Sequence, residues 1–244
     1  MSDDGFFGNM PYLATMPSCA FYIRGMNGSS IRDWSKNHVT LTNNLVTNST
    51  GVTPKFPPAS NYYNGSGYLE VPYSSSGNSN NVLAANNFTY SMWFNANSVY
   101  SSTIQWLILL GNYTSLCASI GLGIQASKLV LYMGSTSSTW DIASGVNLGA
   151  ISTATWYNVI ITRSGSTFTG YLNGSSTAIG TSSNSLYNAG YAVLFGQGWL
   201  PSSGTNPYTG YMDEIALFNG ANGEVPAYTD IWKNGTQLRR LIVG

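Results

Sequence analysis

Alternation of hydrophobic and polar residues dominates the chain from about residue 18 onward, and it predicts strands rather than helices. In the segment 86–98, Phe88, Tyr90, Met92 and Phe94 face one way, and the residues between them face the other. Gly, Asn and Ser separate such segments at intervals of roughly 8–12 residues, which is typical of a sandwich or barrel. The pattern therefore predicts an all-β fold.

Two segments have the pattern of hairpins, and one has that of a buried strand. Residues 156–174 read as strand, turn and strand, and we expect Arg163 to be solvated at the tip of this hairpin. Residues 120–135 give a second pair of strands around "QASK". The nearly continuous apolar run 103–112 predicts a central strand that is buried on both faces.

The two ends of the chain depart from this pattern. The first residues carry apolar side chains without a regular period, and Gly and Pro interrupt them, which favours an extended arm. Two alternatives stay open: a floppy terminus, or an arm that docks Phe6, Phe7 and Tyr12 on a neighbouring subunit. The expected organisation is an arm (1–17), one β-sandwich (18–222), and a C-terminal helix and tail (223–244).

Composition changes the picture of the surface. Only 7% of the 244 residues are charged, and nine basic residues balance nine acidic ones, whereas soluble domains average roughly 25%. Ser, Thr, Asn, Gly and Tyr must therefore supply the polar surface. Because phosphate binding requires clustered Lys and Arg, neither nucleic acid nor an anionic membrane is expected as a partner.

The beginning of the chain and its cysteines bear on the compartment. The first residues lack the basic region and the uninterrupted apolar stretch of a signal peptide. The longest apolar run, Trp106–Leu110, is far shorter than the roughly 20 residues of a membrane helix. We therefore expect a chain that is made without a secretory signal. Cys19 and Cys117 favour two buried thiols, although a single disulfide between them stays open.

Five segments, in this order, resemble the laminin-G-like branch of the concanavalin A-like lectin/glucanase superfamily. They are 31–44, with an aspartate in a loop; 63–72, "YNGSGYLEVP"; 86–98, "NNFTYSMWFNANS"; 155–174, "TWYNVIITRSGSTFTGYLNG"; and 210–221, "GYMDEIALFNGA". The resemblance spans roughly residues 18–221 and implies two antiparallel sheets packed as a jelly-roll sandwich. Residues 196–210 form a longer link than the family usually has.

The carboxylates do not form the pattern of a glycosidase. Hydrolases of this superfamily resemble one another by a Glu-x-Asp-x-x-Glu-type strand, and this chain has no such run. Asp213 and Glu214 are adjacent, but neighbours on a strand point to opposite faces and cannot flank one bond. His38, the single histidine, has no nucleophile elbow nearby. The chain is therefore expected to be non-enzymatic.

The resemblance also implies a possible structural calcium ion. Laminin-G-like domains often carry one Ca²⁺ ion, and Asp33 and Asp213 lie at positions that resemble the family's oxygen donors. Calcium takes about six to eight oxygens, which two carboxylates and several carbonyls could supply. The alternative is that Asp33 caps a turn and Asp213 binds loop backbone, as Asp commonly does.

Loop aromatics are the candidates for sugar contact, because lectin sites present aromatic faces to sugar rings with polar donors nearby. The candidates are Trp140, Trp199 and Tyr208, with Asn206 as a polar partner. Trp93 and Trp156 match family core positions and are assigned to packing, whereas Trp34 fits either role. Because aromatics are also enriched at interfaces, the same residues would suit subunit contacts.

These observations favour a virion surface protein, either a capsid decoration protein or a fibre. Such a protein is made in a host cytoplasm without a signal peptide and later faces the exterior. It would form a homo-oligomer, bind other capsid or tail subunits through its arm and tail, and stabilise the particle, contact host glycans, or both. The alternative is an extracellular carbohydrate-binding module or adhesion domain.

Overall fold

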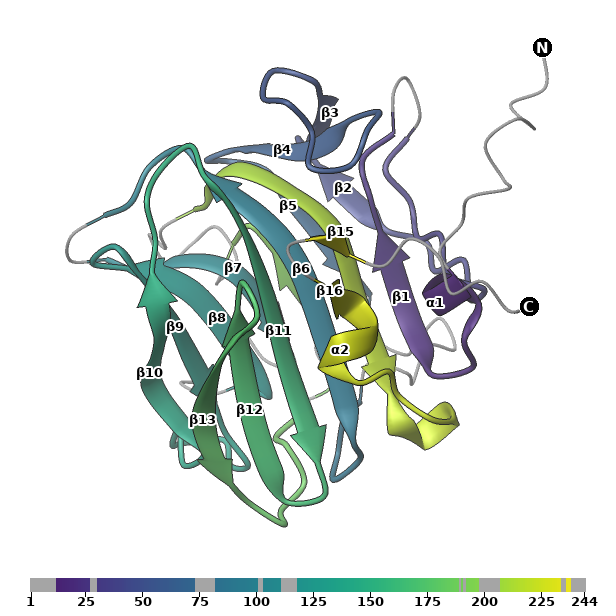
Figure 1. Ribbon diagram of the computed structural model, residues 1–244, viewed down its shortest axis with the longest axis vertical. Coiled ribbons are helices and arrows are strands. Elements are labelled where there is room, and N and C mark those ends of the chain that lie inside the picture. The colour runs from purple at the N-terminus through teal and green to yellow at the C-terminus, as the bar shows by residue number, and fades with distance from the viewer. Residues whose placement is uncertain are drawn as a thin grey trace.

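The structure is a computed structural model, and it confirms the predicted fold class. Two antiparallel sheets pack face to face as a sandwich (Figure 1). The strands of these sheets run from Cys19 to Asn219. The described residues are 12–26, 30–72, 82–100, 103–110, 118–188, 190, 192–197, 207–233 and 236–237. Among them, no helix is long and apolar enough to cross a membrane.

The larger sheet, sheet A, has eight strands. In spatial order these are β13 (Ser175–Thr181), β12 (Thr167–Leu172), β11 (Trp156–Ser164), β6 (Phe88–Ala96), β15 (Thr209–Asn219), β4 (Ser60–Asn64) and β3 (Thr47–Ser49), and β1 (Cys19–Ile23) also pairs with β15. The predicted hairpin around residue 165 is β11–β12. The register between β15 and β6 shifts between Asp213 and Ala216. Before this shift β15 pairs with β4, and beyond it with β1.

The second sheet, sheet B, has seven strands. In spatial order these are β10 (Ala143–Ala150), β9 (Lys128–Met133), β8 (Ile120–Gln125), β7 (Gln105–Leu110), β14 (Val193–Phe195), β5 (Tyr68–Val71) and β2 (Thr42–Asn44). The hairpin predicted around "QASK" is β8–β9. The predicted central strand is β7, which is buried along its whole length between β8 and β14.

The main core lies between the two sheets and follows the predicted alternation. Phe88, Tyr90, Met92 and Phe94 of β6 all face this core. Trp93, which points the other way, is nevertheless almost fully buried, so its assignment to packing is confirmed. A strand that is buried on both faces needs a further layer outside it.

That layer is made by the two ends of the described chain. A second apolar cluster on the outer face of sheet A joins α1 (Tyr12–Thr15), the strands, and α2 (Tyr228–Ile231). Figure 1 shows α2 lying over sheet A and α1 beside β1. A 3-10 turn, η5 (Gly220–Asn222), follows β15, and a short hairpin of β16 (Trp232–Lys233) and β17 (Thr236–Gln237) follows α2. We call residues 220–233 the C-terminal cap.

Two features of the structure differ from what the sequence predicted. Residues 12–15 are helical, not extended, because Leu13 and Ala14 pack into the second cluster. Arg163 is only 2% exposed rather than solvated at the hairpin tip. Its guanidinium donates to the carbonyl oxygens of Gly165 at 2.9 Å, Ala84 at 3.0 Å and Ser182 at 3.0 Å, which replaces its hydration.

Candidate functional site

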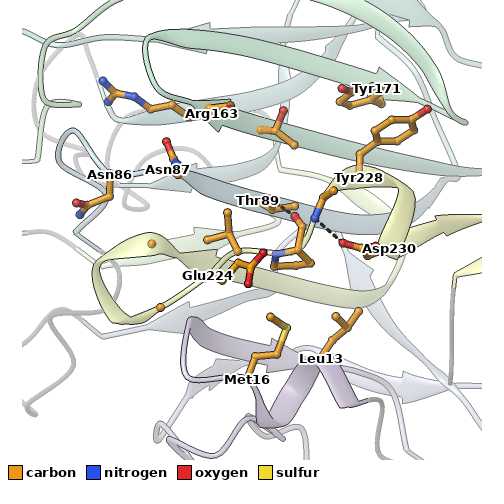
Figure 2. A pocket seen from close by; sticks show the side chains of 17 residues that line it. Leu13, Met16, Asn86, Asn87, Thr89, Arg163, Tyr171, Glu224, Tyr228 and Asp230 are labelled. Atoms are coloured by element: carbon orange, nitrogen blue, oxygen red, sulfur yellow. Dashed lines mark hydrogen bonds between the residues drawn. The ribbon is translucent and has the colours of Figure 1, made fainter. Parts of the chain in front are cut away.

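A groove of about 710 Å³ runs between sheet A and the C-terminal cap (Figure 2). Figure 2 shows Arg163 with Asn86 and Asn87 at one end, and Tyr171 of β12 with Tyr228 of α2 at the other. The two tyrosine rings stack, with centroids 4.1 Å apart and planes 11° from parallel. Each ring therefore covers one face of the other, which leaves less aromatic surface for a ligand.

Several polar side chains of this groove already bind protein atoms. Thr89 Oγ1 donates to the carbonyl oxygen of Pro226 at 2.6 Å, and Asp230 Oδ2 accepts the N–H of Ala227 at 2.7 Å. Asn87 Oδ1 accepts the N–H of Gly165 at 2.8 Å. These bonds hold the C-terminal cap and the hairpin tip in place. We therefore interpret the groove as a packing interface between sheet A and the cap rather than as a ligand site.

Sheet B carries a different feature on its outer face. Trp106 of β7, Tyr132 of β9 and Trp140 in the β9–β10 connection belong to a third apolar cluster, separate from the main core. The ring centroids of Trp106 and Tyr132 lie 5.8 Å apart, and those of Tyr132 and Trp140 lie 5.4 Å apart. We call these three side chains the aromatic patch.

Glycines make room for this patch on the sheet. Strand β8 alternates apolar residues, which face the main core, with Gly121 and Gly123. A Cβ atom at Gly121 would lie 2.8 Å from Cζ3 of Trp106, and one at Gly123 would lie 2.7 Å from Cγ1 of Ile104. Side chains at these two positions would therefore push Trp106 and Ile104 away from the backbone of sheet B.

The three rings differ in exposure. Trp106 is 9% exposed and supports the patch from beneath. Tyr132 and Trp140 are only partly buried, so their rings are the part of the patch that a ligand can reach. Aromatic rings with few rotatable bonds offer a large contact area at a low cost in conformational entropy.

The turn that carries Trp140 is organised by the next residue. Asp141 accepts hydrogen bonds from the backbone N–H of Ser135 at 2.7 Å and from its Oγ at 2.5 Å. The N–H of Thr139 donates to Oγ1 of Thr136 at 3.2 Å. Burial acts to raise the pKa of Asp141, but the hydrogen bonds from Ser135 outweigh it, and the pKa lies below its ordinary value. The ionised carboxylate therefore holds the turn closed.

The predicted sugar contacts fall in three different places. Trp140 lies in the aromatic patch. Tyr208 is wrong as a sugar contact, because it is fully buried and its Oη donates to the carbonyl oxygen of Asn95 at 2.8 Å. Several predicted residues lie outside what the structure describes, namely Trp199, Asn206, Phe6, Phe7, Cys117 and the side chain of Tyr12.

Asp33 organises the loop that follows β1. Its Oδ1 accepts the N–H groups of Tyr22 and Ser35, each at 2.8 Å. Its Oδ2 accepts the N–H of Val39 at 2.9 Å and the hydroxyl of Ser35 at 2.7 Å. These bonds are the turn-capping role that the sequence left open as the alternative to calcium.

Asp213 is fully buried on β15 and also binds loop backbone. Its Oδ1 accepts the N–H groups of Gly25 at 3.4 Å and Glu214 at 3.0 Å, and its Oδ2 accepts that of Phe56 at 3.3 Å. Burial, with the nearby Glu214 carboxylate, raises the pKa of Asp213 to about 8. Among the described residues, no three His, Cys, Asp or Glu side chains gather where they could hold a metal ion. Calcium at Asp33 or Asp213 stays a prediction.

Two residues of the aromatic patch were missed from the sequence. Trp106 stood within an apolar run that read as buried strand, and Tyr132 stood within a hairpin. The signal that could have found them is the alternation Ile-Gly-Leu-Gly-Ile at residues 120–124. Glycines at every second position of a strand leave one face of the sheet open for rings from its neighbours.

The family follows from the sequence and the fold together. The chain belongs to the concanavalin A-like lectin/glucanases superfamily, whose laminin-G-like family model matches residues 64–224. A search of curated protein sequences found no match.

Solved structures show the same fold at low sequence identity. The binding domain of Paraclostridial Mosquitocidal Protein 1 has a TM-score of 0.63 and 15% identity over 83% of this chain and 49% of its own. Domain 4 of AbnA, a GH43 extracellular arabinanase from Geobacillus stearothermophilus in complex with arabinotriose, has a TM-score of 0.58 and 14% identity over 83% of this chain and 93% of its own.

A third similar structure is the binding domain of Botulinum Neurotoxin DC in complex with SialylT. It has a TM-score of 0.61 and 14% identity over 82% of this chain and 48% of its own. This chain therefore spans about half the length of the two toxin binding domains and nearly the whole of the arabinanase domain. At such low sequence identities, the likeness to these structures extends to the fold alone.

Proposed function

We propose that this protein is a non-catalytic carbohydrate-binding domain whose aromatic patch contacts the glycan. The observation that carries the proposal is the pair of accessible rings, Tyr132 and Trp140, supported by Trp106 over the glycines of β8. A sugar ring has a C–H face that packs on an aromatic ring, while its hydroxyl groups need hydrogen-bond partners. Ser144, which is exposed and paired with Tyr132 across β10 and β9, offers one such partner.

The carboxylates support a binding role rather than hydrolysis. Retaining glycosidases need two carboxyl groups about 5–5.5 Å apart that flank the substrate bond. Asp213 and Glu214, the adjacent pair, are 0% and 2% exposed and belong to sheet A. A substrate on the aromatic patch of sheet B would not reach them.

The comparisons support the alternative interpretation of the sequence more than the virion interpretation. One similar structure is an arabinanase domain solved with arabinotriose, and another is a toxin binding domain solved with SialylT. The arabinanase domain, nearly the whole of which this chain spans, is a precedent for glycan binding by this fold, whereas the chain spans only about half of the toxin binding domain. A place on a virion surface, virion subunits as partners and a homo-oligomer stay predictions.

The test measures how three proteins, the wild type and two variants, bind to a panel of immobilised glycans. The wild type is expected to bind at least one immobilised glycan, and Trp140→Ala should lower that affinity by at least about tenfold. This magnitude is taken from aromatic side chains that stack on nucleic-acid bases, where removal of one ring costs about 1–3 kcal/mol. Tyr228→Ala removes a partly buried ring from the groove on sheet A and serves as the matched control. Binding that is lost in Tyr228→Ala and kept in Trp140→Ala would move the site to the groove.

A further inference from the structure

We infer that the glycan bound by the aromatic patch is uncharged, and that the patch discriminates against sugars carrying carboxylate or sulfate groups. This inference rests on the proposed function and names the class of its ligand. It is carried by the distribution of charge around sheet B.

The sequence keeps charge away from most of sheet B. No Asp, Glu, Lys, Arg or His occurs in residues 71–127, 142–162 or 164–212. Strands β7, β8, β10 and β14 therefore carry no charge at all. The ranges also include the chain segments between β7 and β8 and between β14 and β15. The charged residues on the strands of sheet B and in the β9–β10 connection are Glu70 of β5, Lys128 of β9 and Asp141.

The strands of sheet B carry one cation, Lys128 of β9, which does not lie beside Tyr132. Lys128 is four residues before Tyr132 on the same strand, and at roughly 3.3 Å per residue their Cα atoms lie about 13 Å apart. Since this separation exceeds the screening length of about 8 Å at physiological salt, Lys128 exerts little long-range attraction on an anion held at the Tyr132 backbone position. Recognition of a carboxylate or sulfate normally uses direct hydrogen bonds from Arg or Lys.

The charge nearest to Trp140 in the sequence has the wrong sign for an anion. Asp141 follows Trp140 directly and is held ionised by the hydrogen bonds from Ser135. Its field would repel a sialate, a uronate or a sulfated sugar. On sheet A, the Arg163 guanidinium is already bound to three backbone carbonyls, and Lys55 Nζ lies 3.9 Å from the ring centroid of Trp93.

If the ligand is neutral, the affinity of the protein for it should not depend on the salt concentration. The binding energy would come from ring contact and from hydrogen bonds to hydroxyl groups, neither of which is screened. We expect the affinity to change by less than about twofold between about 20 mM and about 500 mM NaCl, whereas an ion-paired ligand would weaken strongly over that range.

The experiment compares matched neutral and acidic probes on the full chain. Immobilised galacto-, arabino-, xylo- and gluco-oligosaccharides are set against sialyllactose, polygalacturonate and heparin at the two salt concentrations. The expected result is binding to one or more neutral probes, at least about tenfold tighter than to acidic ones, and lost in Trp140→Ala. Acidic-probe binding that is lost in Trp140→Ala would overturn this inference and leave the proposed function standing. Absence of binding to every probe would overturn the proposed function itself.

A gain-of-binding variant keeps the test independent of any loss of folding. Ser144→Arg places a guanidinium at an exposed position that pairs with Tyr132 in the β9–β10 register. We expect it to improve binding of an acidic probe relative to its neutral counterpart by about fivefold, close to the ~1 kcal/mol of an exposed ion pair. Ser176→Arg, at an exposed position on β13 of sheet A, is the matched control and should change neither. Equal changes in both variants would contradict the placement of the ligand.

Discussion

Replacement of Arg163 by Met tests whether the buried guanidinium holds the edge of sheet A together. The side chain donates three hydrogen bonds, at 2.9, 3.0 and 3.0 Å, to carbonyls of three separate chain segments. Met keeps an aliphatic side chain but removes all three donors and the guanidinium, whose Cζ lies 5.0 Å from the ring centroid of Phe168. At about 1–1.5 kcal/mol for each carbonyl left without its partner, the variant should lose about 3–4.5 kcal/mol of unfolding free energy.

Urea unfolding followed by tryptophan fluorescence measures this loss. For a domain of this size the loss corresponds to a fall in Tm of roughly 10 °C. Lys128→Met removes an exposed cation from a hairpin of sheet B and should stay within about 0.5 kcal/mol of the wild type. If Arg163→Met lost less than about 1 kcal/mol, the guanidinium would be solvated and the three bonds would carry no stability.

Two further predictions concern the aromatic patch, and a third concerns the buried carboxyl group of Asp213. Gly121→Val places a Cβ atom 2.8 Å from Cζ3 of Trp106, and we expect this variant to lose glycan binding. The control is Gly165→Ala, whose Cβ would have no atom within 4 Å, and it should keep the wild-type affinity in the same assay. Asp141→Ala should weaken glycan binding by about threefold to tenfold. Because the pKa of Asp141 is lowered in the native protein, wild-type binding should be constant above about pH 5 and should fall only below the ordinary Asp pKa of about 3.9. Asp213 stays protonated in the native state up to a pKa of about 8 but ionises near 3.8 when unfolded. Its contribution to stability should therefore fall as pH rises from 3.8 to 8, and Tm measured against pH should lack that slope in Asp213→Asn.

The sequence predicted the sandwich because the alternation on strands such as β6 reports burial directly. Phe88, Tyr90, Met92 and Phe94 need only the main core to explain them. The alternation could not report the extra layer over sheet A, because that layer depends on contacts between segments far apart in the chain. Trp93 stands beside Trp232 of the C-terminal cap, with ring centroids 5.7 Å apart, across more than half of the sequence.

The candidate site was predicted in part, for a similar reason. Trp140 was found because it stands in a polar stretch, where a large aromatic residue is conspicuous. Trp106 and Tyr132 lie on strands, and only the register of β7, β8 and β9 brings them together over Gly121. Tyr208 looked equally accessible in the sequence, but the tertiary fold turns it into the core next to Tyr63, with ring centroids 6.0 Å apart.

The two outer faces of the sandwich should respond differently to mutation, which Ile231→Ala tests. Ile231 of α2 is almost fully buried in the cluster that covers sheet A, so its truncation should lower the unfolding free energy by about 2–4 kcal/mol. The aromatic patch lies on the opposite sheet and shares no residue with that cluster. Glycan affinity, measured well below the lowered Tm, should therefore stay within about twofold of the wild type, as expected for separate sites. A clear loss of affinity in folded Ile231→Ala protein would show that the C-terminal cap contributes to the binding surface.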